Sequence, residues 1–162
     1  MEPRPTPPER SRRTFLVVVD DSAEMRAALR YACRRARHTG GRVALLRVVE
    51  PGEFQSFAGI GALMHAEARQ AAEDLLQRMA GAVNEMSGEI PVLYVREGAR
   101  RDEVLRVIDE EEISLLVLGA GTGSDGPGPL VSALTGRYVS RLRVPLTIVP
   151  GHLDDQAIDV LS

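Results

Sequence analysis

Five short apolar runs recur along the chain, each separated from the next by a helical pattern, and this alternation restricts the fold more than any other feature. The first run, Phe15-Leu-Val-Val-Val19, shows no polar alternation, as expected of a strand covered on both faces. Similar runs follow at 43–49, 90–95, 113–118 and 144–149. Helical patterns fill the intervals at 22–38, 61–86, 99–110 and 130–142. The apolar stripe of the longest pattern is expected at Met64, Ala68, Ala71, Leu75, Met79, Ala82 and Met86. The order predicts an α/β fold with three layers, in which a doubly wound, five-stranded parallel sheet carries helices on both faces.

The two ends of the chain differ from this central pattern. Residues 1–13 contain four prolines, four arginines and almost no apolar side chains, which predicts a disordered tail. Residues 14–150 hold all the apolar runs and form the predicted domain. Residues 151–162 are expected to be a C-terminal tail or a cover for the last strand. No apolar run approaches the ~18 residues of a membrane span, and no secretory signal is evident, so we expect a cytoplasmic protein without membrane contact.

The charge balance disfavours nucleic acid as a partner. The chain has a formal net charge of −3, and all 20 of its basic residues are arginines, four of them in the predicted tail. The predicted domain is therefore mildly acidic, whereas binding of a phosphate backbone needs clustered positive charge. With three tyrosines, three phenylalanines and no tryptophan, the chain also offers little for base stacking.

Signatures of a metal site or a catalytic centre are absent from the sequence. Cys33 is the single cysteine, and it falls within a helical pattern without a nucleophile motif. The three histidines are far apart and share no ligand spacing, so we predict no metal site. Neither a serine–histidine–aspartate order nor a GxSxG elbow is present, and no catalytic residue is predicted.

A glycine-rich stretch from Gly119 to Gly128 is the strongest local signal for binding. It follows the fourth apolar run and precedes a helix that can begin at Pro129. Glycines let backbone N–H groups converge on an anion, and a helix N-terminus adds partial positive charge. Ser132 and Thr135 supply hydroxyl donors in the first turns of that helix. The pattern favours a phosphate site, with a plain flexible loop as the alternative.

Two acids, Asp20 and Asp21, follow the first apolar run, at the strand end where parallel sheets bind their ligands. Carboxylates there suit chelation of Mg²⁺ or contact with a ribose or base. Asp21 is favoured as the cap of the next helix, because Glu24 follows it in capping-box register. For Asp20, a ligand contact and a structural role both remain open.

Over residues 14–150, the order of these units resembles the universal stress protein family. The family's opening Val-Asp-x-Ser stands here as Val19-Asp20-Asp21-Ser22, and its closing strand is matched by Pro145-Leu-Thr-Ile-Val149. The end of its second strand corresponds to Leu45-Leu46-Arg47-Val48-Val49, and its third unit to Gly98–Gly119. A two-component receiver domain begins in a similar way, but that family needs a lysine after its fifth strand, and this chain has none.

The resemblance implies a Rossmann-like fold of the adenine nucleotide alpha hydrolase type. It also implies a stress-response regulator that binds ATP or another adenine nucleotide, with Mg²⁺, in a crevice at the C-terminal ends of the strands. The family usually dimerises through its last strand, which implies a homodimer formed through Val144–Val149. Two other functions stay open. One is a family member that has lost nucleotide binding and acts as a dimeric interaction module. The other is a slow ATPase or self-phosphorylating enzyme that uses Ser132 or Thr135.

The nucleotide motif itself is degenerate. In ATP-binding members the fourth strand leads into Gly-x2-Gly-x9-Gly-[Ser/Thr]. An ungapped match from Gly119 places Thr122 at the second glycine and Ser132-Ala133 at the final pair. The resemblance implies an adenine and ribose end, a region near the ribose or first phosphate, and a distal phosphate end. By this resemblance, Val19, Asp20 and Val48 line the adenine and ribose end. Gly119, Gly121 and Thr122 approach the ribose or first phosphate, and Ser132, Ala133 and Thr135 hold the distal phosphates. Gly126 and Gly128 belong to a stretch that is a candidate for a variant phosphate cradle.

Overall fold

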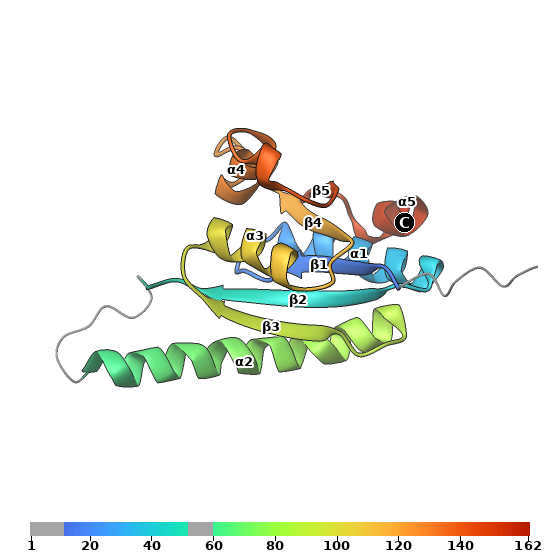
Figure 1. The fold of residues 1–162 in the computed structure, drawn as a ribbon. Coiled ribbons are helices and arrows are strands. Elements are labelled where there is room, and N and C mark those ends of the chain that lie inside the picture. The colour runs from blue at the N-terminus through green and yellow to red at the C-terminus, as the bar shows by residue number, and fades with distance from the viewer. Residues whose placement is uncertain (1–11, 52–59) are drawn as a thin grey trace, which may run out of the picture.

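The computed structural model describes residues 12–51 and 60–162, and its centre is a five-stranded parallel sheet (Figure 1). The strands are β1 (Thr14–Val18), β2 (Arg42–Val49), β3 (Val92–Glu97), β4 (Leu115–Ala120) and β5 (Leu146–Pro150). They lie in the order β3-β2-β1-β4-β5, so the direction of winding reverses between β1 and β4. The predicted sheet is confirmed, although its last three strands begin two residues later than expected.

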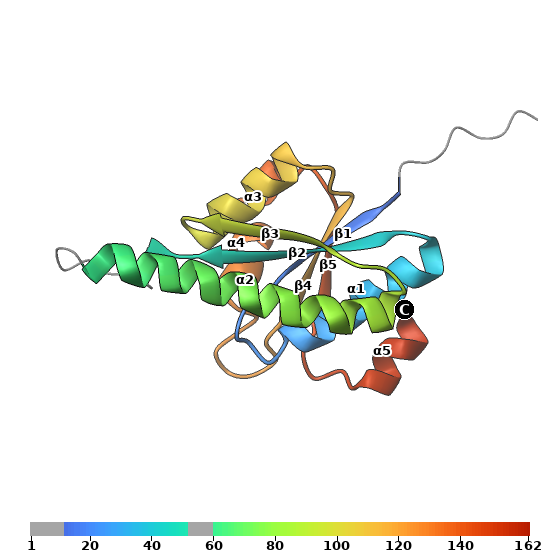
Figure 2. The same ribbon diagram turned by 90° about the horizontal axis from the view of Figure 1, so that it is seen from below.

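Helices cover both faces of the sheet, as predicted. They are α1 (Met25–Thr39), α2 (Ile60–Ser87), α3 (Arg100–Glu110), α4 (Pro129–Thr135) and α5 (Asp155–Leu161), and a 3-10 turn, η2 (Val139–Arg141), follows α4. Figure 2 shows α3 on one side of the strands and α1 and α5 on the other, and the buried residues of α4 belong to the same core layer as those of α3. Successive residues of β1 belong to these two layers, because Val17 packs with the α1 side and Leu16 with the α3 side. Both faces are buried, which explains the lack of polar alternation in the first run.

The N-terminus of α1 differs from the prediction. The helix begins at Met25, and the residue at its N-cap position, Glu24, makes no side-chain cap hydrogen bond. Asp20, rather than Asp21, stabilises the preceding turn, since its carboxylate accepts hydrogen bonds from the Ser22 N–H at 2.8 Å and the Ser22 hydroxyl at 2.5 Å. The cap predicted for Asp21 is therefore wrong. At the other end, Gly40 terminates the helix at a φ of 70°, as expected.

Two other helices depart from their predicted form. The helix expected over 130–142 ends at Thr135, where the Gly136 N–H bonds to the Ser132 carbonyl before the chain turns into η2. In α2, the predicted apolar stripe is rotated. Ala72, Leu76 and Val83 are buried, whereas the expected Ala71 and Ala82 are exposed. Alanine and glycine occur on every side of this helix, so its sequence does not single out one face.

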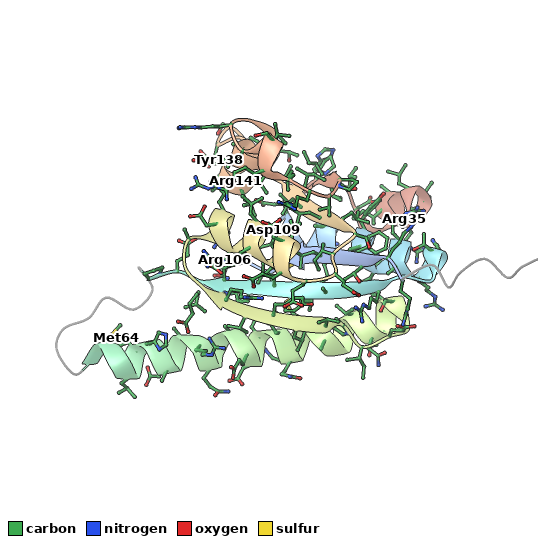
Figure 3. All side chains as sticks on the ribbon, in the orientation of Figure 1. Arg35, Met64, Arg106, Asp109, Tyr138 and Arg141 are labelled. Atoms are coloured by element: carbon green, nitrogen blue, oxygen red, sulfur yellow. The ribbon has the colours of Figure 1, made fainter. Side chains whose placement is uncertain are left out.

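The C-terminal residues form a docked helix rather than a tail. Ile158 of α5 is fully buried in the core beside α1. Both carboxylate oxygens of Asp159 accept hydrogen bonds from Arg30 at 2.8 Å, and Asp155 pairs with Arg26. Arg35, labelled in Figure 3, donates to the carbonyl of Ser162. The predicted N-terminal tail, residues 1–13, lies outside the described residues except for Arg12 and Arg13.

Asp159 is expected to make the docking of α5 dependent on pH. The hydrogen bonds from Arg30 lower the pKa of Asp159 below its ordinary value of 3.8. A carboxylate with a depressed folded pKa stabilises the fold above its unfolded pKa, and this contribution is lost as pH falls through the folded value. The free energy of unfolding of wild type should therefore exceed that of Asp159→Asn at pH 6, and this difference should shrink as the pH falls through the lowered folded pKa of Asp159. A difference between the two that does not change with pH would contradict this role.

Candidate functional site

A crevice opens at the C-terminal ends of β1 and β4, where the strand order reverses. This is the position at which open parallel sheets bind ligands, because loops on either side diverge there. The crevice has a volume of about 290 Å³. Its polar lining comes from the turn after β1, from Arg100 at the start of α3 and from the glycine-rich stretch, with Val18, Leu118 and Val131 as apolar walls. We call it the inner crevice.

Asp20 lies at the wall of the inner crevice and is held in place by its own turn. One of its carboxylate oxygens bonds to Ser22, while the other lies 4.0 Å from a guanidinium nitrogen of Arg100. Arg100 also lies 3.7 Å from Glu50, so it bridges the ends of β1 and β2. Asp21 projects outward, with its side chain 92% exposed and 4.0 Å from Arg47. The arrangement leaves carboxylate oxygens and one guanidinium at the crevice.

Two glycines at the end of β4 allow backbone atoms of neighbouring segments to pack closely against them. A Cβ atom on Gly119 would lie 2.2 Å from the Glu24 carbonyl oxygen, and one on Gly121 would lie 2.8 Å from the Gly126 carbonyl oxygen. A Cβ on Gly151, after β5, would also meet Glu24, at 2.5 Å. The residue before α1 is therefore wedged over the ends of β4 and β5. These glycines set how closely the floor of the crevice approaches α1.

The end of the glycine-rich stretch leads into α4 beside the crevice. Gly128 has a φ of 106°, a backbone conformation that favours glycine, and Pro129 occupies the first turn as predicted. Gly128, Leu130 and Val131 all line the inner crevice. Backbone N–H groups in the first turn of a helix have no partner within the helix. Leu130 and Val131 therefore supply two such N–H groups beside the crevice.

The structure brings together some of the predicted site residues and separates others. Asp20, Gly119 and Gly128 line the inner crevice. Val19 and Val48 are 1% exposed and belong to the core beneath it. Ala133 lines an adjoining hollow, while Thr135 donates its hydroxyl to the Val131 carbonyl at 2.7 Å. The remaining predicted residues lie outside the crevice lining: Gly121 is half-buried, and Thr122, Gly126 and Ser132 are exposed.

Sequence reasoning missed two charged residues of the crevice lining, Arg100 and Glu24. Arg100 follows Gly98 after β3 and reaches the crevice only because β3 and β1 end at the same edge of the sheet. Glu24 was interpreted as a capping residue, yet it packs against the β4 end and lines the crevice. No pattern in the sequence marks either residue, although an arginine at the start of a helix, where cations are disfavoured, is a weak signal for Arg100.

Other reactive groups lie away from this edge. Cys33 is fully buried on α1, and burial raises the pKa of its thiol to about 12, which keeps it protonated. Within residues 12–51 and 60–162, no group of three or more histidine, cysteine or acidic side chains is placed to hold a metal ion. Across the same part of the chain, none of the helices combines the length and apolar character needed to cross a bilayer.

Comparison with known proteins gives one family match and many similar folds. The model of the universal stress protein family matches residues 11–150. The universal stress protein UspA from Lactobacillus plantarum is 25% identical, with a TM-score of 0.65, and the match covers 86% of this chain and 99% of that one. No curated protein matches the sequence significantly.

Two further solved structures share the fold at lower identity. A universal stress protein in complex with cAMP has a TM-score of 0.57 and 17% identity, over 88% of this chain and 99% of that chain. A family protein from Arabidopsis thaliana with AMP bound has a TM-score of 0.60 and 13% identity, over 85% of this chain and 91% of its own.

Proposed function

Because the chain belongs to the universal stress protein family, we propose that it binds an adenine nucleotide in the inner crevice and acts as a cytoplasmic stress-response regulator. The observation that carries the proposal is the crevice at the reversal of strand order, lined by Asp20, Gly119 and Gly128. The cAMP and AMP complexes of two structural neighbours support the choice of an adenine nucleotide for this fold.

Different residues of the crevice lining suit different parts of a nucleotide. The carboxylate of Asp20 accepts hydrogen bonds, as ribose hydroxyls or an adenine amino group require. The first turn of α4 and the Arg100 guanidinium suit phosphate oxygens. With ATP as the ligand, Mg²⁺ would be held by one or two carboxylates, Asp20 among them, together with the phosphates, which is the usual manner of binding this ion.

We place no hydrolysis step in this function. The Thr135 hydroxyl is occupied by the Val131 carbonyl, and Ser132 does not line the crevice. Within the described chain, no histidine or carboxylate is hydrogen-bonded to either hydroxyl as a general base would be. The proposal therefore assigns nucleotide binding alone to this site.

Calorimetric titration with AMP and ATP, each with Mg²⁺, tests the proposal. Asp20→Asn keeps the size of the side chain but removes its charge, and we expect about tenfold weaker binding, the usual effect of losing one charged hydrogen-bond partner. Asp125→Asn is the matched control, because Asp125 is exposed in the glycine-rich stretch and does not line the crevice. No binding of either nucleotide at millimolar concentration would instead favour an interaction module.

A homodimer formed through β5 is the second part of this proposal. β5 is an edge strand, and Ile148 is 40% exposed on it. An edge strand presents unpaired backbone groups that a second copy can satisfy. Ile148→Lys should shift the protein toward monomer in analytical ultracentrifugation, whereas Val160→Lys, on the exposed face of α5, should not. A wild-type protein that sediments as a monomer at micromolar concentration would rule out this dimer.

A further inference from the structure

The inner crevice continues into two further hollows along α3 and α4. A middle hollow of about 310 Å³ is lined by Glu50, Arg100, Arg101 and Ala133, among others. An outer hollow of about 490 Å³ lies between α3 and η2. Arg100 lines both the inner crevice and the middle hollow, and Arg101 lines both the middle and the outer hollow. The three hollows therefore adjoin one another, and we call the whole row the groove, which starts at the strand ends and follows α3 as far as Asp109.

The charge of the lining changes sign along this groove. At the inner end, the carboxylates of Asp20, Asp21 and Glu24 outnumber the single guanidinium of Arg100. The middle hollow has Glu50 against two arginines. At the outer end, three arginines face two aspartates: Arg101, Arg106 and Arg141 against Asp102 and Asp109. A bound molecule with one polar, uncharged end and one anionic end is thus oriented by the groove.

The outer carboxylates are already neutralised by arginines. Asp102 lies 3.0 Å from Arg101, and Asp109 lies 3.2 Å from Arg143. Arg106 pairs with the buried Glu103 at 2.5 Å. Arg141 makes no ion pair with any residue that the structure describes, so its charge remains available for an anion. Figure 3 shows Arg141 and Tyr138 on the opposite side of this hollow from Arg106 and Asp109.

Tyr138 gives the outer hollow a defined wall. The Arg101 guanidinium carbon lies 3.9 Å from the centroid of its ring, and that of Arg137 lies 5.9 Å away. Stacking against an aromatic ring restricts a guanidinium without using its N–H groups; in Arg101 the Nε and Nη2 groups contact Asp102, so Nη1 is the nitrogen that remains for an anion. From Arg101 to Asp109, α3 advances about 12 Å at 1.5 Å per residue, so the outer hollow has the length of a chain of groups rather than of a single anion.

We propose that the groove selects a nucleotide with an extended phosphate chain, whose nucleoside occupies the inner crevice and whose terminal phosphates reach Arg101 and Arg141. This inference rests on the proposed binding of an adenine nucleotide. It adds the ligand class, a nucleoside polyphosphate with more phosphates than ATP, and it assigns the outer hollow as the site of the terminal phosphates. Arg141 is the residue that distinguishes long phosphate chains from short ones.

Calorimetric titration with AMP, ATP and adenosine 5′-pentaphosphate at constant ionic strength tests the assignment. The affinity of the wild type should rise with the number of phosphates, and the pentaphosphate should bind at least about tenfold more tightly than AMP. Arg141→Ala should weaken pentaphosphate binding about fivefold, an effect reduced by solvent exposure, and leave AMP binding unchanged. Arg78→Ala, on the exposed side of α2, removes the same charge outside the groove and should change neither the AMP affinity nor the pentaphosphate affinity.

The possible failures separate the two proposals. Two results would contradict the extended groove but leave the nucleotide site supported. In the first, AMP binds and the pentaphosphate binds no more tightly than AMP. In the second, Arg141→Ala and Arg78→Ala weaken pentaphosphate binding equally. If no adenine nucleotide binds, both proposals fail. Titration with inorganic tripolyphosphate then shows whether the outer hollow binds a polyanion by itself. Such binding, abolished in Arg141→Ala, would replace the nucleotide by polyphosphate and overturn the inference as stated.

Discussion

Gly119→Ala should destabilise the protein by about 3 kcal/mol or more, measured as the free energy of unfolding in urea. The added Cβ would lie 2.2 Å from the Glu24 carbonyl oxygen and 2.6 Å from its carbonyl carbon. Both are backbone atoms at the start of α1, so relief requires the helix to move away from β4. That movement also opens the inner crevice, and we expect nucleotide binding to weaken in the same variant.

Gly123→Ala provides the matched comparison within the same glycine-rich stretch. No atom lies within 4 Å of a Cβ built on Gly123, and its φ is not positive. We expect its free energy of unfolding to stay within about 0.5 kcal/mol of wild type, because alanine there restricts only the unfolded chain. Equal effects of the two substitutions would show that Gly119 is not held against Glu24.

Ile158→Ala should cost about 3 kcal/mol, again measured by urea unfolding. Ile158 is fully buried beside α1, and shortening it leaves a cavity between α1 and α5 that the short helix cannot close without leaving its position. The same residue anchors the row of ion pairs between α1 and α5, so the variant should also lose the pH dependence contributed by Asp159.

Val160→Ala is the control for this prediction, since Val160 lies on the same helix but is 81% exposed. Its free energy of unfolding should differ from wild type by less than about 0.5 kcal/mol, as for most surface substitutions. If Ile158→Ala costs as little as Val160→Ala, α5 is detached in solution. The C-terminal residues would then be the tail that their sequence also allowed.

The two structural predictions and the proposed nucleotide site all depend on the position of α1. Glu24 is wedged between α1 and the ends of β4 and β5, and the space left beside it is the inner crevice. The position of α1 is fixed from the other side by α5, which pairs with Arg26 and Arg30. Weakening either contact is therefore expected to alter binding through the position of α1, and in Ile158→Ala this happens without any change to a residue that lines the crevice.

The apolar runs by themselves determined the fold class and the order of units. The first, second and fourth runs are buried on both faces, and strands of that kind need helices above and below them, so parallel winding follows from the pattern of the runs. Residues near the ends of the first and fourth runs, Asp20 and Gly119, could also be placed in the crevice, because ligand sites in such sheets follow from strand order. The family resemblance was carried by the same order of units.

Tertiary structure alone decided which partner each of these residues meets. Gly119 accommodates Glu24, a residue distant in sequence, and no local pattern reveals that contact. Arg100, Arg101 and Arg141 come from segments on either side of β4 and share a groove only after α3 and η2 pack together. Local sequence specifies strands, helices and turns through short-range sterics and hydrogen bonding, whereas the charge and shape of a groove arise from residues that only the packed layers bring together.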